Sequence, residues 1–217
     1  KRKFVFRDEN EKFYDDNAER MIFFCKGLME TVKKFGWPPH LIHCNGWMTS
    51  LIPLYLKTQY AKDPVFAQTK IIYTAYEKEF KEKLNKNFLK KAKIGDDVKD
   101  KDLAVLKDLT NDSLTLAGVA YADAVTVGSP KIKDLAAIKK AAGKKPWLDF
   151  QEENDLQPKY LEFYKMLLSY IRYSCMRSAV FVLTAGIFLF ACKKESDIGG
   201  NILPGDDLLN AQFTDTA

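Results

Sequence analysis

"LIHCNGW", residues 41–47, is the stretch from which the organisation of this chain is most readily deduced. A short apolar run stops at a histidine, a cysteine and an asparagine, and a glycine and a tryptophan then begin a new segment. In open α/β sheets, ligands bind beyond the carboxyl ends of the strands, where turns of this kind lie. The stretch therefore predicts a buried strand that ends in a turn facing a ligand site.

Helical and strand-like segments alternate on both sides of this turn. Apolar residues recur at helical spacing in several segments, whereas the runs at 40–44, 69–76 and 124–130 are short and apolar, as buried strands are. Residues 3–6 also suggest a strand. This alternation predicts an α/β fold with a parallel sheet covered by helices on both faces. Helices are expected at 18–35, 48–61, 103–123, 131–144 and 156–171.

Composition limits the classes of function. The chain has 217 residues, of which 47% are hydrophobic and 29% charged, with a formal net charge of +5. Lysines and acidic residues interleave, so no one-signed stripe suggests a nucleic-acid partner. Four cysteines share no metal-binding spacing and there are two histidines, which excludes a zinc site of usual spacing. One sizeable domain is expected, with Cys25 and Cys44 as small buried hydrophobes.

The composition changes after residue 168. "MRSAVFVLTAGIFLFAC", residues 176–192, begins with a basic residue and continues as an apolar run, the pattern of a signal peptide. Its end resembles a bacterial lipoprotein cleavage box in which Cys192 would carry the lipid. We therefore expect three parts: a domain at 1–168, a hydrophobic helix that is signal-like or an anchor at 169–192, and a polar disordered tail at 193–217.

Three interpretations of the hydrophobic segment stay open. Residues 176–217 can be the start of an unrelated lipoprotein joined to this chain by a gene-fusion error, a buried C-terminal helix, or a genuine membrane anchor that makes membrane contact through 176–192. The chain has no initiator methionine and reads as the interior of a longer protein. Residues 1–168 by themselves suggest a cytoplasmic location.

With the helix that follows the turn, "HLIHCNGWMTSLIPLYLK" resembles the bacterial glycogen and starch synthases, whose corresponding stretch runs His-x-His-Asp-Trp and then Leu-x-Pro-x-Tyr-Leu. A second block, "YADAVTVGSPKI", is similar to the family's Ala-Asp-x-Val-Thr-x-Val-Ser-Pro. The resemblance covers residues 1–168 and is to a divergent branch of the family. The residues that match the family pattern in the two blocks are His43, Trp47, Leu51, Pro53, Tyr55, Leu56, Lys57, Ala122, Asp123, Val125, Thr126, Val127, Ser129 and Pro130.

The resemblance implies the N-terminal Rossmann-like half of a two-domain glycosyltransferase of GT-B type. That family transfers glucose from ADP-glucose to an α-1,4-glucan in glycogen biosynthesis, without a metal or other cofactor. The partners implied are an α-glucan and the missing C-terminal glycosyltransferase domain. Since this chain lacks that domain and the family's Lys-Thr-Gly-Gly loop, we expect a truncated domain that is inactive alone, with no residue assigned a catalytic role.

The chain departs from the family pattern at the turn. Asn45 stands where the family has its second histidine and Gly46 where it has aspartate, while Tyr76 and Glu77 replace a His-Asn pair. Asparagine can hydrogen-bond a sugar hydroxyl but does not titrate near neutral pH. The substrate-binding residues predicted on this basis are His43, Asn45, Trp47, Tyr76, Glu77 and Ser129.

Ordinary structural roles remain alternatives for these residues. His43 ends a buried strand and can be a satisfied core histidine, and Trp47 can be a core residue instead of a sugar platform. Asn45 and Gly46 can simply form the tight turn. At the level of the whole domain, a non-catalytic glucan-binding or scaffold domain is the alternative to a glucosyltransferase domain.

Overall fold

The computed structural model describes residues 4–169, 180–184 and 187–191. Their strands form one sheet in the order β4-β3-β2-β1-β5-β6, with every neighbouring pair parallel except β5 and β6. The strands are β1 (Leu41–Asn45), β2 (Lys70–Ala75), β3 (Ala124–Val127), β4 (Trp147–Leu148), β5 (Val180–Thr184) and β6 (Ile187–Ala191). The α-helices are α1 (Asn17–Lys34), α2 (Leu51–Lys57), α3 (Phe88–Ala92), α4 (Asp100–Leu103), α5 (Asn111–Tyr121), α6 (Leu135–Ala142) and α7 (Glu153–Ser169).

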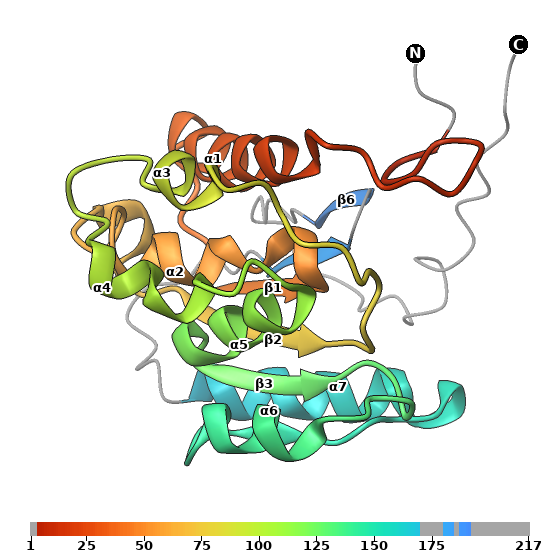
Figure 1. The fold of residues 1–217 in the computed structure, drawn as a ribbon. Helices are drawn as coiled ribbons and strands as arrows, with labels where there is room; N and C mark the ends of the chain where they lie inside the picture. The colour runs from red at the N-terminus through yellow and green to blue at the C-terminus, as the bar shows by residue number, and fades with distance from the viewer. Residues whose placement is uncertain (1–3, 170–179, 185–186, 192–217) are drawn as a thin grey trace, which may run out of the picture.

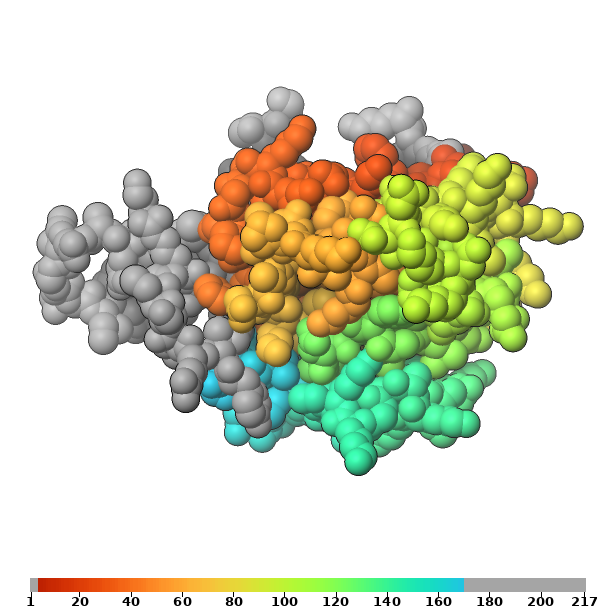
Figure 2. Space-filling model, turned by 90° about the vertical axis from the view of Figure 1, so that its left-hand side faces the viewer, coloured from red at the N-terminus to blue at the C-terminus, as the bar shows by residue number. Residues whose placement is uncertain are grey.

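Helices cover both faces of this sheet, which confirms the predicted α/β architecture of three layers (Figure 1). On one face, alternate strand residues such as Ile42 and Tyr73 pack against α1, α2 and α5. On the other face, Leu41 and Ile72 contact α7. Figure 2 shows the left-hand side of Figure 1, where the yellow-green segment 80–106 lies beside the orange region of α2. The strands are buried on both faces, as parallel strands usually are.

Helix α1 forms where the apolar stripe predicts it. Met21, Cys25 and Met29 lie on its buried face, and Gly36 follows its end with a left-handed backbone (φ 58°). Asn17, the first residue of α1, donates from Nδ2 to the carbonyl of Phe6 at 2.8 Å. Cys25 and Cys44 are buried and unpaired, as predicted.

The long helix predicted at 103–123 is wrong. The chain forms α4, a 3-10 turn at Ala104–Leu106, and then α5, which begins at Asn111. Leu109 adopts a left-handed backbone (φ 56°), which an α-helix does not allow, and Thr110 and Ser113 cap the start of α5 reciprocally. The apolar periodicity continues through this break, so periodicity alone joined two separate helices.

The strand predicted at 3–6 is also wrong for the described residues 4–6. Asp8 accepts two backbone N–H bonds, from Asn10 at 2.8 Å and Lys12 at 2.9 Å, and so turns the chain back on itself. An isolated antiparallel bridge joins Arg7 to Phe13. These bonds fix a tight loop here, and the preceding segment has no strand partner among the described residues.

The hydrophobic helix expected within 169–192 is wrong where the structure describes that segment. Residues 180–184 and 187–191 are the antiparallel strands β5 and β6, and β5 continues the sheet by pairing with β1. Valine, isoleucine and phenylalanine dominate both strands, and these residue types favour extended backbone. Among the described residues, no helix is long and apolar enough to cross a membrane. Cys192 and the tail at 193–217 lie outside the described residues, and the domain limits stay a prediction.

Candidate functional site

The carboxyl ends of β1, β2 and β3 meet at one edge of the sheet. Asn45 pairs in register with Thr74, and Ala75 with Val127, so the residues that follow these strands lie side by side. This edge carries four of the residues predicted from the sequence. We call them the edge cluster: Asn45 at the end of β1, Tyr76 and Glu77 after β2, and Ser129 after β3.

Asn45 and Tyr76 are in contact within the edge cluster. The Tyr76 hydroxyl donates to Asn45 Oδ1 at 3.4 Å, a long hydrogen bond, and Asn45 is only 9% exposed. The carbonyl of Asn45 accepts from the Thr49 hydroxyl at 3.0 Å, which ties the end of the strand to the turn. The Tyr76 hydroxyl therefore contacts the Asn45 side chain, and the 3-10 turn Trp47–Thr49 holds its backbone carbonyl.

Two glycines make room for the Tyr76 ring. A Cβ on Gly128 would lie 2.4 Å from Tyr76 Cε1, so no side chain fits there while the ring stays in place. Gly46 has φ 69° and ψ −177°, a backbone region that is essentially restricted to glycine. A Cβ at Gly46 would also meet Glu79 Oε1 at 3.3 Å. The glycines at the turn thus serve backbone geometry and close packing.

The other half of the edge cluster is polar and more open. A hydrogen bond from Ser129 lowers the pKa of Glu77, and the charge of Lys131 acts in the same direction. Ser129 Oγ also accepts from the backbone N–H of Lys131 at 3.2 Å. Ser129 is buried and Glu77 is exposed. This hydroxyl–carboxylate pair can hydrogen-bond a ligand, and no histidine lies beside Ser129 to activate it as a nucleophile.

His43 lies inside the sheet instead of at its edge. Its Nδ1 is 2.6 Å from the Tyr164 hydroxyl and its Nε2 is 2.6 Å from Thr74 Oγ1. Thr74 Oγ1 is in turn 2.6 Å from Thr126 Oγ1, and the ring stacks on Tyr160. Burial lowers the pKa of His43 to about 4, so the ring is neutral at physiological pH. Both ring nitrogens are used, which favours the structural alternative for this residue.

Trp47 also lies in the interior. It is 3% exposed and packs against three phenylalanine rings, with centroid distances of 5.0 Å to Phe6, 5.9 Å to Phe13 and 5.0 Å to Phe80. A hydrogen bond from its side chain opposes the raised pKa that burial gives Glu79. With its ring faces covered, Trp47 fits the core alternative better than the sugar platform.

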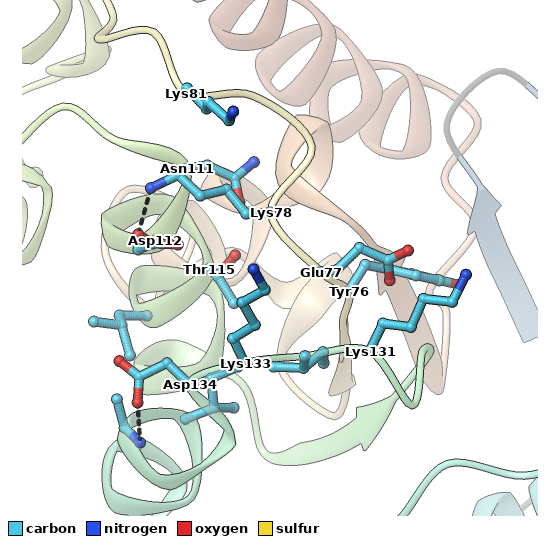
Figure 3. A pocket seen from close by; sticks show the side chains of 14 residues that line it. Tyr76, Glu77, Lys78, Lys81, Asn111, Asp112, Thr115, Lys131, Lys133 and Asp134 are labelled. Carbon is cyan, nitrogen blue, oxygen red and sulfur yellow. Dashed lines mark hydrogen bonds and ion pairs between the residues drawn. The ribbon is translucent and has the colours of Figure 1, made fainter.

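A pocket adjoins the edge cluster, and sequence reasoning did not predict it. It has a volume of about 440 Å³ and lies between the loops after β2 and β3 and the first turns of α5 and α6 (Figure 3). Tyr76 and Glu77 form the wall that it shares with the edge cluster. The signal that the sequence contains is the set of lysines at positions 78, 81, 131 and 133.

The chemistry that these groups offer is hydrogen bonding instead of proton transfer. Asn45 does not titrate, burial raises the pKa of Tyr76, and the pKa of Glu77 is lowered by Ser129. No edge group is poised to exchange a proton near neutral pH. Among the described residues, no group of three or more histidine, cysteine, aspartate or glutamate side chains could hold a metal ion.

Known proteins match the chain over its first two thirds. A family model described as "Starch synthase catalytic domain" matches residues 1–145. A glycogen synthase of Photobacterium profundum is 37% identical over 122 residues, which cover 56% of this chain and 24% of that protein. The glycogen synthase of Desulforudis audaxviator is 35% identical over 116 residues, which cover 54% of this chain. That of Moorella thermoacetica is 33% identical over 129 residues, which cover 59% of this chain. The matched part spans about a quarter of each of these relatives.

Proposed function

The chain belongs to the starch synthase catalytic domain family, and from that premise we propose that it supplies the glucan-facing half of a glucosyl-transfer site. In the proposed reaction, glucose passes from ADP-glucose to an α-1,4-glucan. The donor is a substrate, and the proposal includes no metal or other cofactor. The part of the reaction assigned to this chain is binding of the acceptor glucan.

The observation that carries this proposal is the edge cluster itself. Three neighbouring strands of a family member bring Asn45, Tyr76 and Ser129 to one edge of the sheet, the place where ligands bind in open α/β folds. An asparagine amide both donates and accepts, as a sugar hydroxyl does, and a tyrosine offers an apolar ring face with a polar end. These groups suit an uncharged, hydroxyl-rich ligand.

Bond cleavage is assigned to groups outside this edge. Transfer of glucose requires stabilisation of the leaving diphosphate and of the charge that develops on the sugar. The described residues bring no glycine-rich phosphate loop to the edge cluster, and Asn45 cannot act as an acid or a base. We therefore propose that turnover needs a second domain, and that this chain alone binds glucan without transferring glucose.

Calorimetric titration of the full chain with maltoheptaose tests the proposal, with ADP-glucose titrated in parallel. We expect saturable binding of maltoheptaose and its marked weakening in Asn45→Ala. Asn87→Ala removes an exposed asparagine whose side chain makes no capping bond, so it should leave binding unchanged. A folded chain that shows no binding of maltoheptaose would contradict the proposal.

A non-catalytic glucan-binding domain is the second candidate, and the lack of a titrating group at the edge favours it. A chimaera separates the two. Residues 1–145 would replace the matched part of the Photobacterium profundum relative, and incorporation of labelled glucose into glycogen would be measured. Incorporation supports the glucosyltransferase domain, and glucan binding without incorporation supports the binding domain.

A further inference from the structure

The pocket beside the edge cluster carries more positive charge than its carboxylates neutralise. Four lysines line it, and two of them face acidic partners: Lys78 pairs with Asp112 at 2.8 Å, and Lys131 lies near Glu77. The remaining two, Lys81 and Lys133, have no carboxylate within ion-pair distance in the described part of the chain.

Besides Asp112 and Glu77, a third carboxylate lines the pocket, that of Asp134, and it has a structural partner. It accepts the backbone N–H of Ala137 at 3.2 Å and so caps the start of α6. Figure 3 shows Lys133 reaching toward Thr115 across the pocket, with Lys81 at the opposite rim and Lys131 beside Glu77. The centre of the pocket therefore faces ammonium groups that lack a counter-ion of their own.

A buried amide gives the second, independent sign of a ligand. Asn111 lines the pocket and is 3% exposed, and its side-chain amide makes no hydrogen bond with any described residue. Asn111 is not among the described residues whose polar side-chain atoms are fully buried without a partner, so its amide reaches the pocket and can bond to a ligand there. Asn111 is also the first residue of α5, where backbone N–H groups lack helical acceptors. This corner of the pocket offers several donors to one acceptor group.

The rest of the pocket wall is apolar, and the pocket is too large for a simple anion. Leu116, Ile132 and Ile138 line it, and the Tyr76 ring closes one side. The volume of about 440 Å³ lies in the range of roughly 300–1,000 Å³ that small-molecule sites occupy. An inorganic anion would leave most of the apolar wall uncovered, so the ligand needs a body as well as a charged group.

We propose that this pocket binds a phosphorylated monosaccharide, with its phosphomonoester held by Lys81, Lys133 and the Asn111 amide and its sugar ring on the apolar wall. Ammonium groups bind phosphate as point charges, and an amide N–H adds a charge-assisted hydrogen bond. Such a site goes beyond the proposed function, because it takes an anionic ligand at lysines that lie outside the edge cluster.

Calorimetric titration of the full chain at low ionic strength tests this proposal, with glucose 1-phosphate as the probe. We expect it to bind at least about tenfold more tightly than glucose or inorganic phosphate, because only the phosphorylated sugar engages both the lysines and the apolar wall. Binding of inorganic phosphate as tight as that of glucose 1-phosphate would overturn the sugar-phosphate assignment.

Two variants locate the site. Asn111→Asp keeps the size of the side chain and places a favourable charge at a helix start, so the fold should be retained, but its carboxylate repels the phosphate. Lys133→Gln removes one of the unpaired charges. Each should lower the affinity for glucose 1-phosphate about tenfold or more.

The matched control is Lys26→Gln, which makes the same change of net charge at an exposed position on α1 and should leave the affinity unchanged. Equal affinities in Asn111→Asp, Lys133→Gln and Lys26→Gln would overturn the proposal. The result is independent of the maltoheptaose titration, since the two experiments use different ligands and different variants.

Discussion

His43 and Asn45 lie two residues apart on β1 and therefore project from the same face of the sheet. His43 is covered by α7 and both of its ring nitrogens have partners, whereas Asn45 lies at the end of the strand, where the Tyr76 hydroxyl reaches it. Both positions were predicted to bind substrate. From their different surroundings we propose that Asn45, at the strand end, can meet a ligand, whereas His43 has a structural role.

The same contrast holds for the polar groups around each residue. Within the sheet, Tyr164, His43, Thr74 and Thr126 form one chain of hydrogen bonds that crosses three strands and attaches α7. At the edge, the Tyr76–Asn45 bond is long at 3.4 Å and the Glu77 carboxylate is exposed. The interior groups satisfy one another, whereas the Glu77 carboxylate at the edge is open to solvent. We therefore expect substitutions inside to change stability and substitutions at the edge to change binding.

The largest expected effect is that of Trp47→Ala, which tests whether Trp47 belongs to the interior. Removing a buried ring that contacts Phe6, Phe13 and Phe80 should lower the free energy of unfolding by about 3–5 kcal/mol. Urea denaturation measures it. Phe23→Ala, at a position 81% exposed, should change stability by less than about 0.5 kcal/mol. A stable Trp47→Ala protein that fails to bind maltoheptaose would place Trp47 with the edge groups.

Acid should destabilise the fold through His43. Burial lowers the pKa of His43 to about 4, whereas the unfolded value is about 6.5, so the unfolded chain binds more protons between these values. The contribution of the neutral ring is fully present above pH 6.5 and is lost as the pH falls toward 4, by roughly 3 kcal/mol. Urea denaturation at neutral pH and near pH 5 measures the first part of this loss, about 2 kcal/mol.

Two substitutions isolate this effect from the titration of carboxylates. His43→Gln should flatten the fall in stability between these two conditions, and His40→Gln, which removes the other histidine, should not. An unchanged pH dependence in His43→Gln would mean that His43 is not the buried neutral group described above.

Gly128→Ala tests how tightly the edge is packed, and its effect on the free energy of unfolding should be intermediate. The added Cβ would lie 2.4 Å from the Tyr76 ring and 2.7 Å from Thr74 Cγ2, and overpacking of this kind costs about 1–3 kcal/mol. Part of the loss should be recovered in the Gly128→Ala/Tyr76→Ala double variant. Gly27→Ala, where a Cβ meets nothing within 4 Å, should be neutral or stabilising in thermal denaturation.

The smallest expected effect on stability is that of Asn45→Ala, about 1 kcal/mol, because the hydrogen bond that it loses with the Tyr76 hydroxyl is long at 3.4 Å. Its affinity for maltoheptaose should nevertheless fall about tenfold. Calorimetry and urea denaturation of the same preparation give both quantities. A large loss of stability with unchanged affinity would reverse the contrast between Asn45 and His43.

Elements whose formation depends on short-range residue spacing could be predicted from the sequence. Helix α1 and the three central strands follow from apolar spacing, and the turn after β1 follows from Asn45 and Gly46. The break before α5 was missed although Thr110 and Ser113 mark it, because periodicity continues across it. The C-terminal apolar segment was taken as a helix, whereas pairing with β1 gives a strand.

The arrangement of the edge could not be predicted in the same way. Tyr76 fits only because Gly128, 52 positions later in the chain, has no side chain, and local patterns contain no signal for such a pair. His43 was predicted to bind substrate because it matches the family's His-x-His-Asp-Trp pattern. Its burial depends on Tyr160 and Tyr164 of α7, more than a hundred residues away.

The central claim is that glucan binds at the carboxyl edge of β1, β2 and β3 and not at the buried histidine. Chemical-shift mapping of the isotope-labelled full chain with maltoheptaose tests it most directly. The account predicts that the backbone amides of residues 45–46, 76–79 and 128–131 shift in a saturable way while those of α1 do not. Shifts confined to other regions, or no shifts in a folded protein, would contradict it.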